Sequence, residues 1–168
     1  MDLWSFIHTI HDFPKPWVSF KDIWPLLASP SAFSFVVSAL AKECTDADII
    51  VWLDARGFVF GAAVALQMQK PFVMIRKKWK LPWLVIEQSY DLEYGSNTLT
   101  IQTKPFPAWS KVAIIDDVLA TWWTALAACQ LIEKSWWIVQ WCHFVMTIEV
   151  LAWFHMIKKY SHTSILWV

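Results

Sequence analysis

The stretch KVAIIDDVLATWWTALAACQLIEK, residues 111–134, decides the fold expected for this chain. The apolar residues 112–115 predict a buried β-strand, and residues 124–134 predict a helix. Asp116 and Asp117 follow the strand, and a short Ala-Thr loop leads into the helix. This order is typical of open α/β sheets, in which ligands bind at the carboxyl ends of the strands.

The loop between this strand and helix has the features of a phosphate site. Backbone N–H groups at the start of a helix, aided by its dipole, suit a phosphate. Carboxylates repel phosphate, so Asp116 and Asp117 would instead face ribose hydroxyls or a hydrated Mg²⁺. Spacing alone leaves open the alternative of a solvated acidic pair at a strand end. Trp122 and Trp123 stand where such a loop normally needs glycine.

Composition bounds the class of protein. A chain of 168 residues fits one domain. With 14 basic and 14 acidic residues, it has no overall charge to attract nucleic acid or an anionic membrane. Its three cysteines form neither a CxxC pair nor a metal-binding spacing. Because the N-terminus also lacks a signal-peptide pattern, we expect a cytoplasmic protein without nucleic-acid or membrane partners.

Alternating strands and helices are expected along the rest of the chain. Apolar β-branched runs among them favour a mostly parallel sheet covered on both faces. Ser31 is the expected N-cap of the first long helix. The expected helices are 31–44 and 57–69; the expected strands are 48–54, 71–75, 138–147 and one near 162–168; residues 86–90 and 99–103 would pair as a hairpin or a mobile flap.

The apolar run at residues 136–154 is about as long as a membrane-spanning helix. Gln140, His143 and Glu149 interrupt it, and polar side chains of this kind are costly in a bilayer. We therefore expect a central strand that runs into a loop.

Five segments resemble those of the adenine phosphoribosyltransferases, a branch of the type I phosphoribosyltransferase family. They occur in the family's order across nearly the whole chain, which makes the resemblance highly specific. With dashes at tryptophans, they are DFPKP-VSFKDI-PLL (12–27), LDARGFVFGAAVA (53–65), IRKK-KLP (75–82), SYDLEYG (89–95) and DDVLAT--T (116–124).

The resemblance implies a fold and an activity. The fold is a type I phosphoribosyltransferase-like α/β domain over residues 1–168, with a parallel sheet flanked by helices. A small N-terminal hood would span about 1–30 and a flexible flap about 77–103. The implied reaction joins adenine and phosphoribosyl diphosphate to give AMP and pyrophosphate, in purine salvage. Mg²⁺ would arrive with the substrate, and the protein would be a homodimer.

The resemblance also implies roles for individual residues. Arg56 and Glu93 would be catalytic. Arg56 would lie beside the pyrophosphate, next to a peptide (Asp54–Ala55) that is often strained or cis in this family. Glu93 would lie in the flap with Tyr94 and would act in proton transfer on the purine. At the phosphoribosyl group, the ribose hydroxyls would be bound by Asp116 and Asp117. The residues around the 5′-phosphate would be Ala120, Thr121, Trp122, Trp123 and Thr124, and those at the diphosphate would be Arg76, Lys77 and Lys80. Adenine would be bound by Ser19, Phe20 and Lys21.

Tryptophan replaces the family's glycine at several positions. The chain has 14 tryptophans and only 3 glycines, whereas glycine usually makes up about 7% of residues. The motifs place such tryptophans at 17, 79, 122 and 123, and their context suggests the same at 52, 83, 109, 136 and 137. One cause would explain all of them: UGA codons that mean glycine in the source organism, translated here as tryptophan. UGG codons at these sites would exclude it, and engineered substitution is the other single cause.

Two rival functions remain at this stage. Indoles at Trp122 and Trp123 would add about 400 Å² of side chain where amides must touch phosphate. That crowding would favour a catalytically inactive binding or regulatory protein with the same fold. A related transferase that acts on another purine is the second rival, although the 12–22 segment argues for adenine.

Overall fold

The computed structural model describes residues 1–91, 95–102, 106–148 and 159–167 of the chain. Strands and helices alternate through most of it, as the sequence predicts. In chain order the elements are η1 (Trp4–Phe6), β1 (His8–His11), β2 (Ser19–Asp22), α1 (Trp24–Ala28), α2 (Pro30–Glu43), β3 (Ile49–Leu53), α3 (Gly57–Met68), β4 (Phe72–Lys77), β5 (Val85–Asp91), β6 (Ser96–Gln102), β7 (Lys111–Leu119), α4 (Trp122–Lys134), β8 (Ile138–Thr147) and β9 (His162–Trp167).

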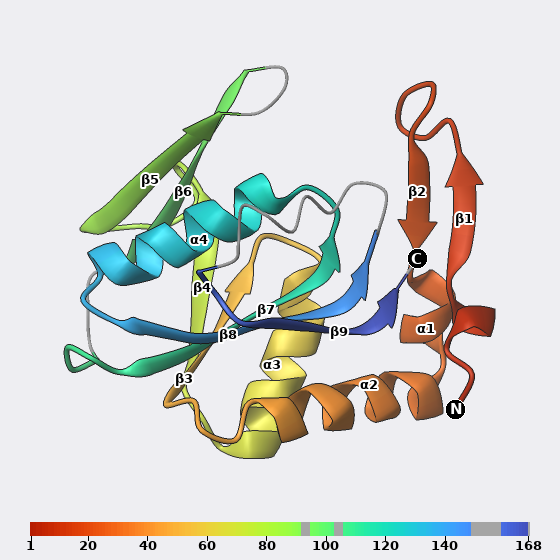
Figure 1. Cartoon of the computed structure of the whole chain (residues 1–168), viewed down its shortest axis with the longest axis horizontal. Coiled ribbons are helices and arrows are strands. Elements are labelled where there is room, and N and C mark those ends of the chain that lie inside the picture. Colours follow the sequence, from red (N-terminus) through yellow and green to blue (C-terminus); the bar gives the residue numbers. More distant parts are fainter. Residues whose placement is uncertain (92–94, 103–105, 149–158, 168) are drawn as a thin grey trace.

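The main sheet has seven strands in the order β5-β6-β4-β3-β7-β8-β9. Strands β4, β3, β7, β8 and β9 are parallel to their neighbours in this series. Strands β5 and β6 form an antiparallel hairpin at one edge, joined to β4 through β6. A separate hairpin of β1 and β2 stands beside the main body (Figure 1). The mostly parallel sheet and the edge hairpin confirm the expected architecture.

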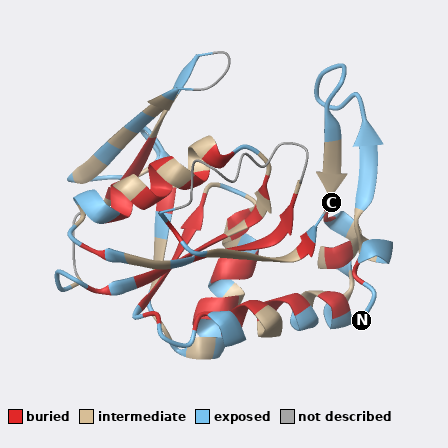
Figure 2. Cartoon of the chain, viewed as in Figure 1, coloured by how far each residue is buried: buried red, intermediate tan, exposed pale blue. Residues whose placement is uncertain are grey.

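Helices cover both faces of the sheet (Figure 1). Side chains alternate along β7, so Val112 and Ile114 pack in the core beneath α4, while Ala113 and Ile115 pack in the core beneath α2 and α3. The central strands are buried along most of their length (Figure 2). The two hairpins are much more exposed, so each can move with less loss of packing than the central sheet.

Strand β8 accounts for the apolar run that begins at residue 136. It pairs with both β7 and β9, and its register with β7 skips Gln140, which therefore sits at an irregularity of the ladder. His143 is buried and its Nδ1 lies 2.8 Å from Thr163 Oγ1. Within the described ranges, no helix is long and apolar enough to span a membrane. Glu149 and the following residues to 158 lie outside those ranges.

The first long helix begins earlier than the sequence analysis expects. Ser29, not Ser31, is the N-cap of α2, and its Oγ accepts a hydrogen bond of 3.3 Å from the Ala32 N–H. Pro30 occupies the first helical position, where the missing N–H costs nothing and the fixed φ suits a helix. The expectation of Ser31 as the N-cap is therefore wrong, because the helix begins at Pro30 with Ser29 as its cap.

Several tryptophans adopt backbone conformations that favour glycine. Among the described residues, five tryptophans have φ between 62° and 70°, a region that bulky side chains rarely occupy. All five are exposed, so packing does not explain them. They are Trp17, Trp79, Trp83, Trp109 and Trp136, all positions where the sequence analysis expects a replaced glycine. This agreement supports a single cause for the tryptophan excess.

We predict that Trp17→Gly and Trp83→Gly each stabilise the chain. Both side chains are more than nine-tenths exposed, so little packing is lost, while relief of the left-handed conformation gains about 1 kcal/mol. Trp24→Gly is the matched control, because Trp24 is also exposed but begins helix α1. Glycine there should lower stability, since it is a poor helix former. Urea unfolding measures all three; equal destabilisation by all three would contradict the argument.

Candidate active site

A cavity of about 370 Å³ opens at the carboxyl ends of β3 and β7. The residues that line it come from four segments that are far apart in the sequence. These are the end of β3 with the turn after it (Leu53, Asp54, Ala55, Arg56), the end of β7 with the loop and first turn of α4 (Asp116, Asp117, Val118, Ala120, Thr121, Thr124), the end of β4 (Lys77), and the β5–β6 hairpin (Tyr90, Asn97, Leu99).

Strand β7 continues to Leu119, so Asp116 and Asp117 lie inside the strand near its carboxyl end and not in the loop after it. The Asp117 N–H donates to Asp116 Oδ1 at 2.9 Å. Burial raises the pKa of both carboxyls; the negative charge of Asp117 raises the pKa of Asp116 further, and Arg56 partly offsets the rise at Asp117. A diol or a hydrated cation in the cavity could therefore stabilise the ionised form of this pair.

Gly57 allows the Asp116 carboxylate to sit against the start of α3. A Cβ at this position would lie 2.7 Å from Asp116 Oδ1, closer than side-chain atoms tolerate. The motif glycine therefore has a steric reason, although its φ is not in the left-handed region. The neighbouring Asp54–Ala55 peptide is cis, as the family resemblance leads us to expect.

Arg56 connects the carboxylates to the β1–β2 hairpin. Its Nε lies 2.7 Å from Asp117 Oδ2, although the N–H is not aligned for a hydrogen bond to that oxygen. Its Nη1 donates to the Lys21 carbonyl at 3.2 Å, and its guanidinium lies 4.9 Å from the centre of the Phe20 ring. About 40% of the Arg56 side chain is exposed, so the guanidinium can reach a ligand in the cavity.

The three residues expected at adenine lie on β2, beyond the cavity lining. Phe20 also makes an edge contact with the Phe13 ring, at 5.2 Å between centroids. The side chains of Ser19 and Lys21 contact His11 and Thr9 of β1, at 3.4 Å and 3.0 Å. Of the three side chains, Phe20 is the one that contacts a cavity-lining residue, because the Arg56 guanidinium lies over its ring.

The basic segment divides into residues with different positions. Lys77 lines the cavity. Arg76 instead pairs with Asp54, at 3.0 Å from its Nε to Oδ2, and thereby supports the turn after β3. Lys80 is exposed in the turn after β4, where its N–H donates to the Lys77 carbonyl. Of these three basic residues, Lys77 alone is among the residues that line the cavity.

Trp122 and Trp123 are not among the residues that line the cavity, so their indoles do not crowd it as the sequence analysis expects. Helix α4 begins at Trp122 instead of residue 124, which turns that indole into the core, where it is 5% exposed. Trp123 is half-buried and packs against the same core, with the two ring centroids 3.9 Å apart. Neither residue has positive φ among the described backbone. The expected crowding of the phosphate loop by indoles, which favoured a catalytically inactive protein, is therefore not found in this cavity.

The cavity side of this loop consists of small and hydroxyl-bearing residues. Ala120, Thr121 and Thr124 line it. Thr121 is the N-cap residue of α4, and within the described region its side chain makes no capping hydrogen bond. The first N–H groups of this 13-residue helix thus remain available beside the cavity, an arrangement that suits an anion.

Two expected flap residues cannot be placed, and two others were missed. Glu93 and Tyr94 lie outside the described residues. Tyr90 and Asn97 line the cavity, although the sequence analysis gives them no role. They are directly opposite each other in the β5–β6 hairpin. The signal that would have found them is this pairing, because directly opposed residues of a hairpin point to the same face.

A parallel sheet with paired carboxylates at its carboxyl edge, beside a helix N-terminus, is the arrangement that the resemblance to phosphoribosyltransferases leads us to expect. The family described as "Phosphoribosyl transferase domain" matches residues 27–136. Adenine phosphoribosyltransferase of Mesomycoplasma hyopneumoniae (strain 7448) is 44% identical over 166 residues, which cover 99% of this chain and 97% of that protein. The chain belongs to the adenine phosphoribosyltransferase family.

Solved structures agree with this assignment. Adenine phosphoribosyltransferase from Thermoanaerobacter pseudethanolicus superposes with a TM-score of 0.95 at 34% identity, covering 99% of this chain and 98% of that chain. The Saccharomyces cerevisiae enzyme, complexed with D-2,5-dideoxy-2,5-imino-altritol 1,6-bisphosphate and adenine, gives 0.92 at 32% identity, covering 98% and 97%. The ordered family motifs thus identified the fold correctly.

We predict that Asp116→Asn stabilises the ligand-free chain in a pH-dependent way. Burial raises the pKa of Asp116, so the folded chain holds this proton more tightly than the unfolded chain does. The resulting stabilisation is fully present below the unfolded pKa of about 3.9, and it is lost as the pH rises through the folded pKa. Asparagine removes the cost of ionising this carboxyl and can still accept from the Asp117 N–H. At pH 7 the melting temperature should rise by about 2–4 °C, the effect of about 1 kcal/mol in a domain of this size.

The same comparison at pH 4 serves as the control for this variant. There the wild-type carboxyl keeps its proton, so the two melting temperatures should converge. A gap that stays constant between pH 4 and pH 7, or a lower melting temperature for the variant at pH 7, would contradict the raised pKa.

Proposed function

We propose that this chain transfers the 5-phosphoribosyl group from phosphoribosyl diphosphate to N9 of adenine, releasing pyrophosphate and forming AMP for purine salvage. The observation that carries the proposal is the meeting of the Asp116–Asp117 pair, Arg56 and the start of α4 around one cavity. Membership of the adenine phosphoribosyltransferase family supports the choice of base.

The loop into α4 binds the 5′-phosphate in this proposal. Helix-start N–H groups donate to its oxygens, and the hydroxyls of Thr121 and Thr124 add further donors from the same side of the cavity. The side chain of Ala120 leaves room for the phosphate to approach. Trp122 and Trp123 contribute their backbone N–H groups, while their indoles hold the loop against the core.

Asp116 and Asp117 accept hydrogen bonds from the ribose hydroxyls. Burial raises the pKa of both carboxyls, and hydroxyl donors would stabilise their ionised form. Mg²⁺ would arrive with the substrate, and Asp116 and Asp117 would be its candidate contacts in this chain. The charges in the cavity wall suit such a substrate, because the two carboxylates would attract the cation and Arg56 would attract the diphosphate.

The reaction breaks the bond from the anomeric carbon to the diphosphate and forms a bond to adenine N9. As positive charge develops on the ribose, negative charge develops on the leaving pyrophosphate. Arg56 and Lys77 lie nearest to stabilise that charge, and Arg76 and Lys80 complete the basic segment. Glu93 handles the purine proton, and the β5–β6 hairpin is the flap that excludes water.

Adenine binds under the β1–β2 hairpin, which is the hood. Phe20 stacks on the base, and the main chain around Ser19 and Lys21 reads its edge. Because Arg56 lies over the Phe20 ring, it must shift as adenine enters. It moves toward the diphosphate, whose negative charge attracts it. We also propose a homodimer in the cytoplasm, where the free thiols of the three described cysteines would remain reduced.

We predict that the chain forms AMP from adenine and Mg²⁺–phosphoribosyl diphosphate, and that Arg56→Gln lowers kcat about 100-fold or more, the usual loss when a group that stabilises transition-state charge is removed. Lys78→Gln is the matched control. It removes a cation from the adjacent segment, but Lys78 pairs at the surface with Glu87, and such exposed pairs contribute little.

A direct assay of radiolabelled adenine conversion measures both variants. The Lys78 variant should retain activity within about twofold, given the small value of an exposed pair. Full activity in Arg56→Gln would remove Arg56 from the mechanism. Failure of the folded wild-type chain to form AMP, or a preference for hypoxanthine or guanine over adenine, would overturn the proposed function.

A further inference from the structure

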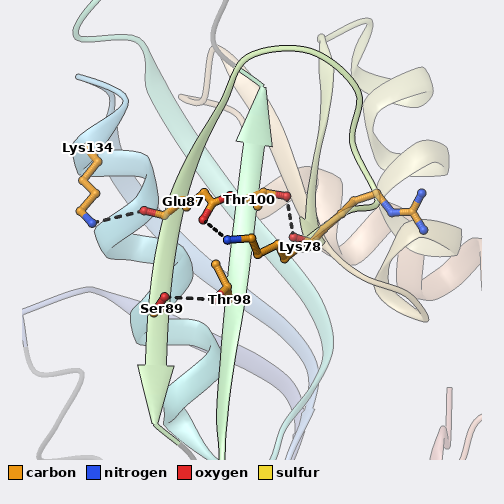
Figure 3. Close-up of polar contacts among 7 residues, drawn as sticks. Lys78, Glu87, Ser89, Thr98, Thr100 and Lys134 are labelled. Atoms are coloured by element: carbon orange, nitrogen blue, oxygen red, sulfur yellow. Dashed lines mark hydrogen bonds and ion pairs between the residues drawn. The ribbon is translucent and has the colours of Figure 1, made fainter.

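Strand β5 is fastened along helix α4 by three polar contacts. Lys134 Nζ donates to the Glu87 carbonyl at 3.3 Å, and Gln88 Nε2 donates to Gln130 Oε1 at 3.0 Å. The third contact joins Tyr90 Oη to Thr124 Oγ1 at 3.3 Å. As residue numbers rise along β5 they fall along α4, so the contacts advance from the far end of the helix toward the cavity. Figure 3 shows the first of them, between Lys134 and Glu87.

Only the third contact lies in the cavity wall. Tyr90 and Thr124 both line the cavity, whereas Gln88 and Gln130 do not. The Tyr90 ring is half-buried and packs against the core beneath α4, so its hydroxyl is held in place. Asn97, directly opposite Tyr90 in the hairpin, lines the same cavity. Within the described part of the hairpin, Tyr90 thus connects it to the phosphate loop through a hydroxyl.

Two hydroxyls in contact can form a directed chain of hydrogen bonds. Each can donate one hydrogen bond and accept others. If Thr124 donates to a phosphate oxygen, its own oxygen becomes the acceptor for the Tyr90 O–H, and consecutive bonds strengthen each other. The present separation of 3.3 Å exceeds the usual 2.7–2.8 Å of hydroxyl pairs. The contact therefore has room to shorten when an anion draws on Thr124.

We propose that Tyr90 is a positioning residue: it orients the Thr124 hydroxyl toward the 5′-phosphate and thereby ties the β5–β6 hairpin to an occupied phosphate loop. The inference rests on the proposed function and deepens it, because it assigns to the flap strand a part in recognising the phosphoribosyl phosphate. Tyr90 acts through Thr124 and touches neither adenine nor the diphosphate.

A purely structural role for Tyr90 makes a different prediction. If the hydroxyl only fastens β5 to α4, then losing the Gln88–Gln130 contact should have the same effect as losing the Tyr90–Thr124 contact. If Tyr90 positions Thr124, only the contact in the cavity should affect phosphate binding. Tyr90→Phe keeps the buried ring and removes the hydroxyl alone. Gln130→Ala breaks the remote contact with a residue that favours helix.

The test measures KM for phosphoribosyl diphosphate and for adenine, together with calorimetric binding of Mg²⁺–phosphoribosyl diphosphate. Tyr90→Phe should raise both the Kd and the KM for phosphoribosyl diphosphate about 3- to 10-fold, the range of one hydrogen bond. The KM for adenine should change less than about twofold, since no hydrogen bond to adenine is lost. Gln130→Ala should leave all three constants unchanged.

Thr124 supplies the second half of the test. Tyr90→Phe should add no further loss in a Thr124→Ala background, because the hydroxyl through which it acts is gone. In a Thr124→Ser background, which keeps a hydroxyl, the effect of Tyr90→Phe should return.

Each outcome has one meaning. The proposal is overturned if Tyr90→Phe matches the wild type or Gln130→Ala, or if it alters adenine and phosphoribosyl diphosphate constants equally; AMP synthesis by the wild type would then leave the proposed function standing. If the folded wild-type chain binds no phosphoribosyl diphosphate at all, the proposed function and this inference fail together.

Discussion

The ion pair between Arg56 and Asp117 is the contact on which the rest of the site depends. It joins the turn after β3 to the end of β7, at 2.7 Å between Nε and Oδ2. Through Phe20 and the Lys21 carbonyl, the same guanidinium also holds the β1–β2 hairpin toward the cavity. One cation therefore links the proposed ribose, diphosphate and adenine regions. A substrate that carries a diol and a diphosphate competes for both sides of this pair, so its entry rearranges the link among all three.

The sheet makes that contact possible by bringing distant residues to one edge. Parallel pairing of β3 with β7 places both strand ends together, and the buried strands leave little freedom to shift them. Gly57 lets the Asp116 carboxylate approach the start of α3. On the other side, Trp122 anchors the start of α4 in the core, so the loop keeps its cavity face clear. Acidic, basic and hydroxyl-bearing side chains thus meet in a cavity of about 370 Å³.

Much of this arrangement could be predicted from the sequence, because apolar β-branched runs such as 112–115 and the carboxylates after them constrain both the strand and its ligand edge. The positions of Trp122 and Trp123 could not, because a helix that starts two residues earlier turns the first indole from the loop into the core. The N-cap of α2 is Ser29 and not the expected Ser31, because Pro30 favours the first helical position. Tyr90 was missed because its position in the cavity depends on hairpin register and on packing against α4. The positive φ of Trp17 and Trp83 supports the replaced-glycine hypothesis where the chain is exposed.

A crystal structure of the unaltered chain with Mg²⁺ and phosphoribosyl diphosphate tests the central claim most directly. We expect the ribose hydroxyls within hydrogen-bond distance of Asp116 and Asp117, the 5′-phosphate against the N–H groups at the start of α4, and the Trp122 indole still buried beneath that helix. Density for the ligand elsewhere, or a Trp122 indole displaced into the cavity in place of the phosphate, would contradict this account.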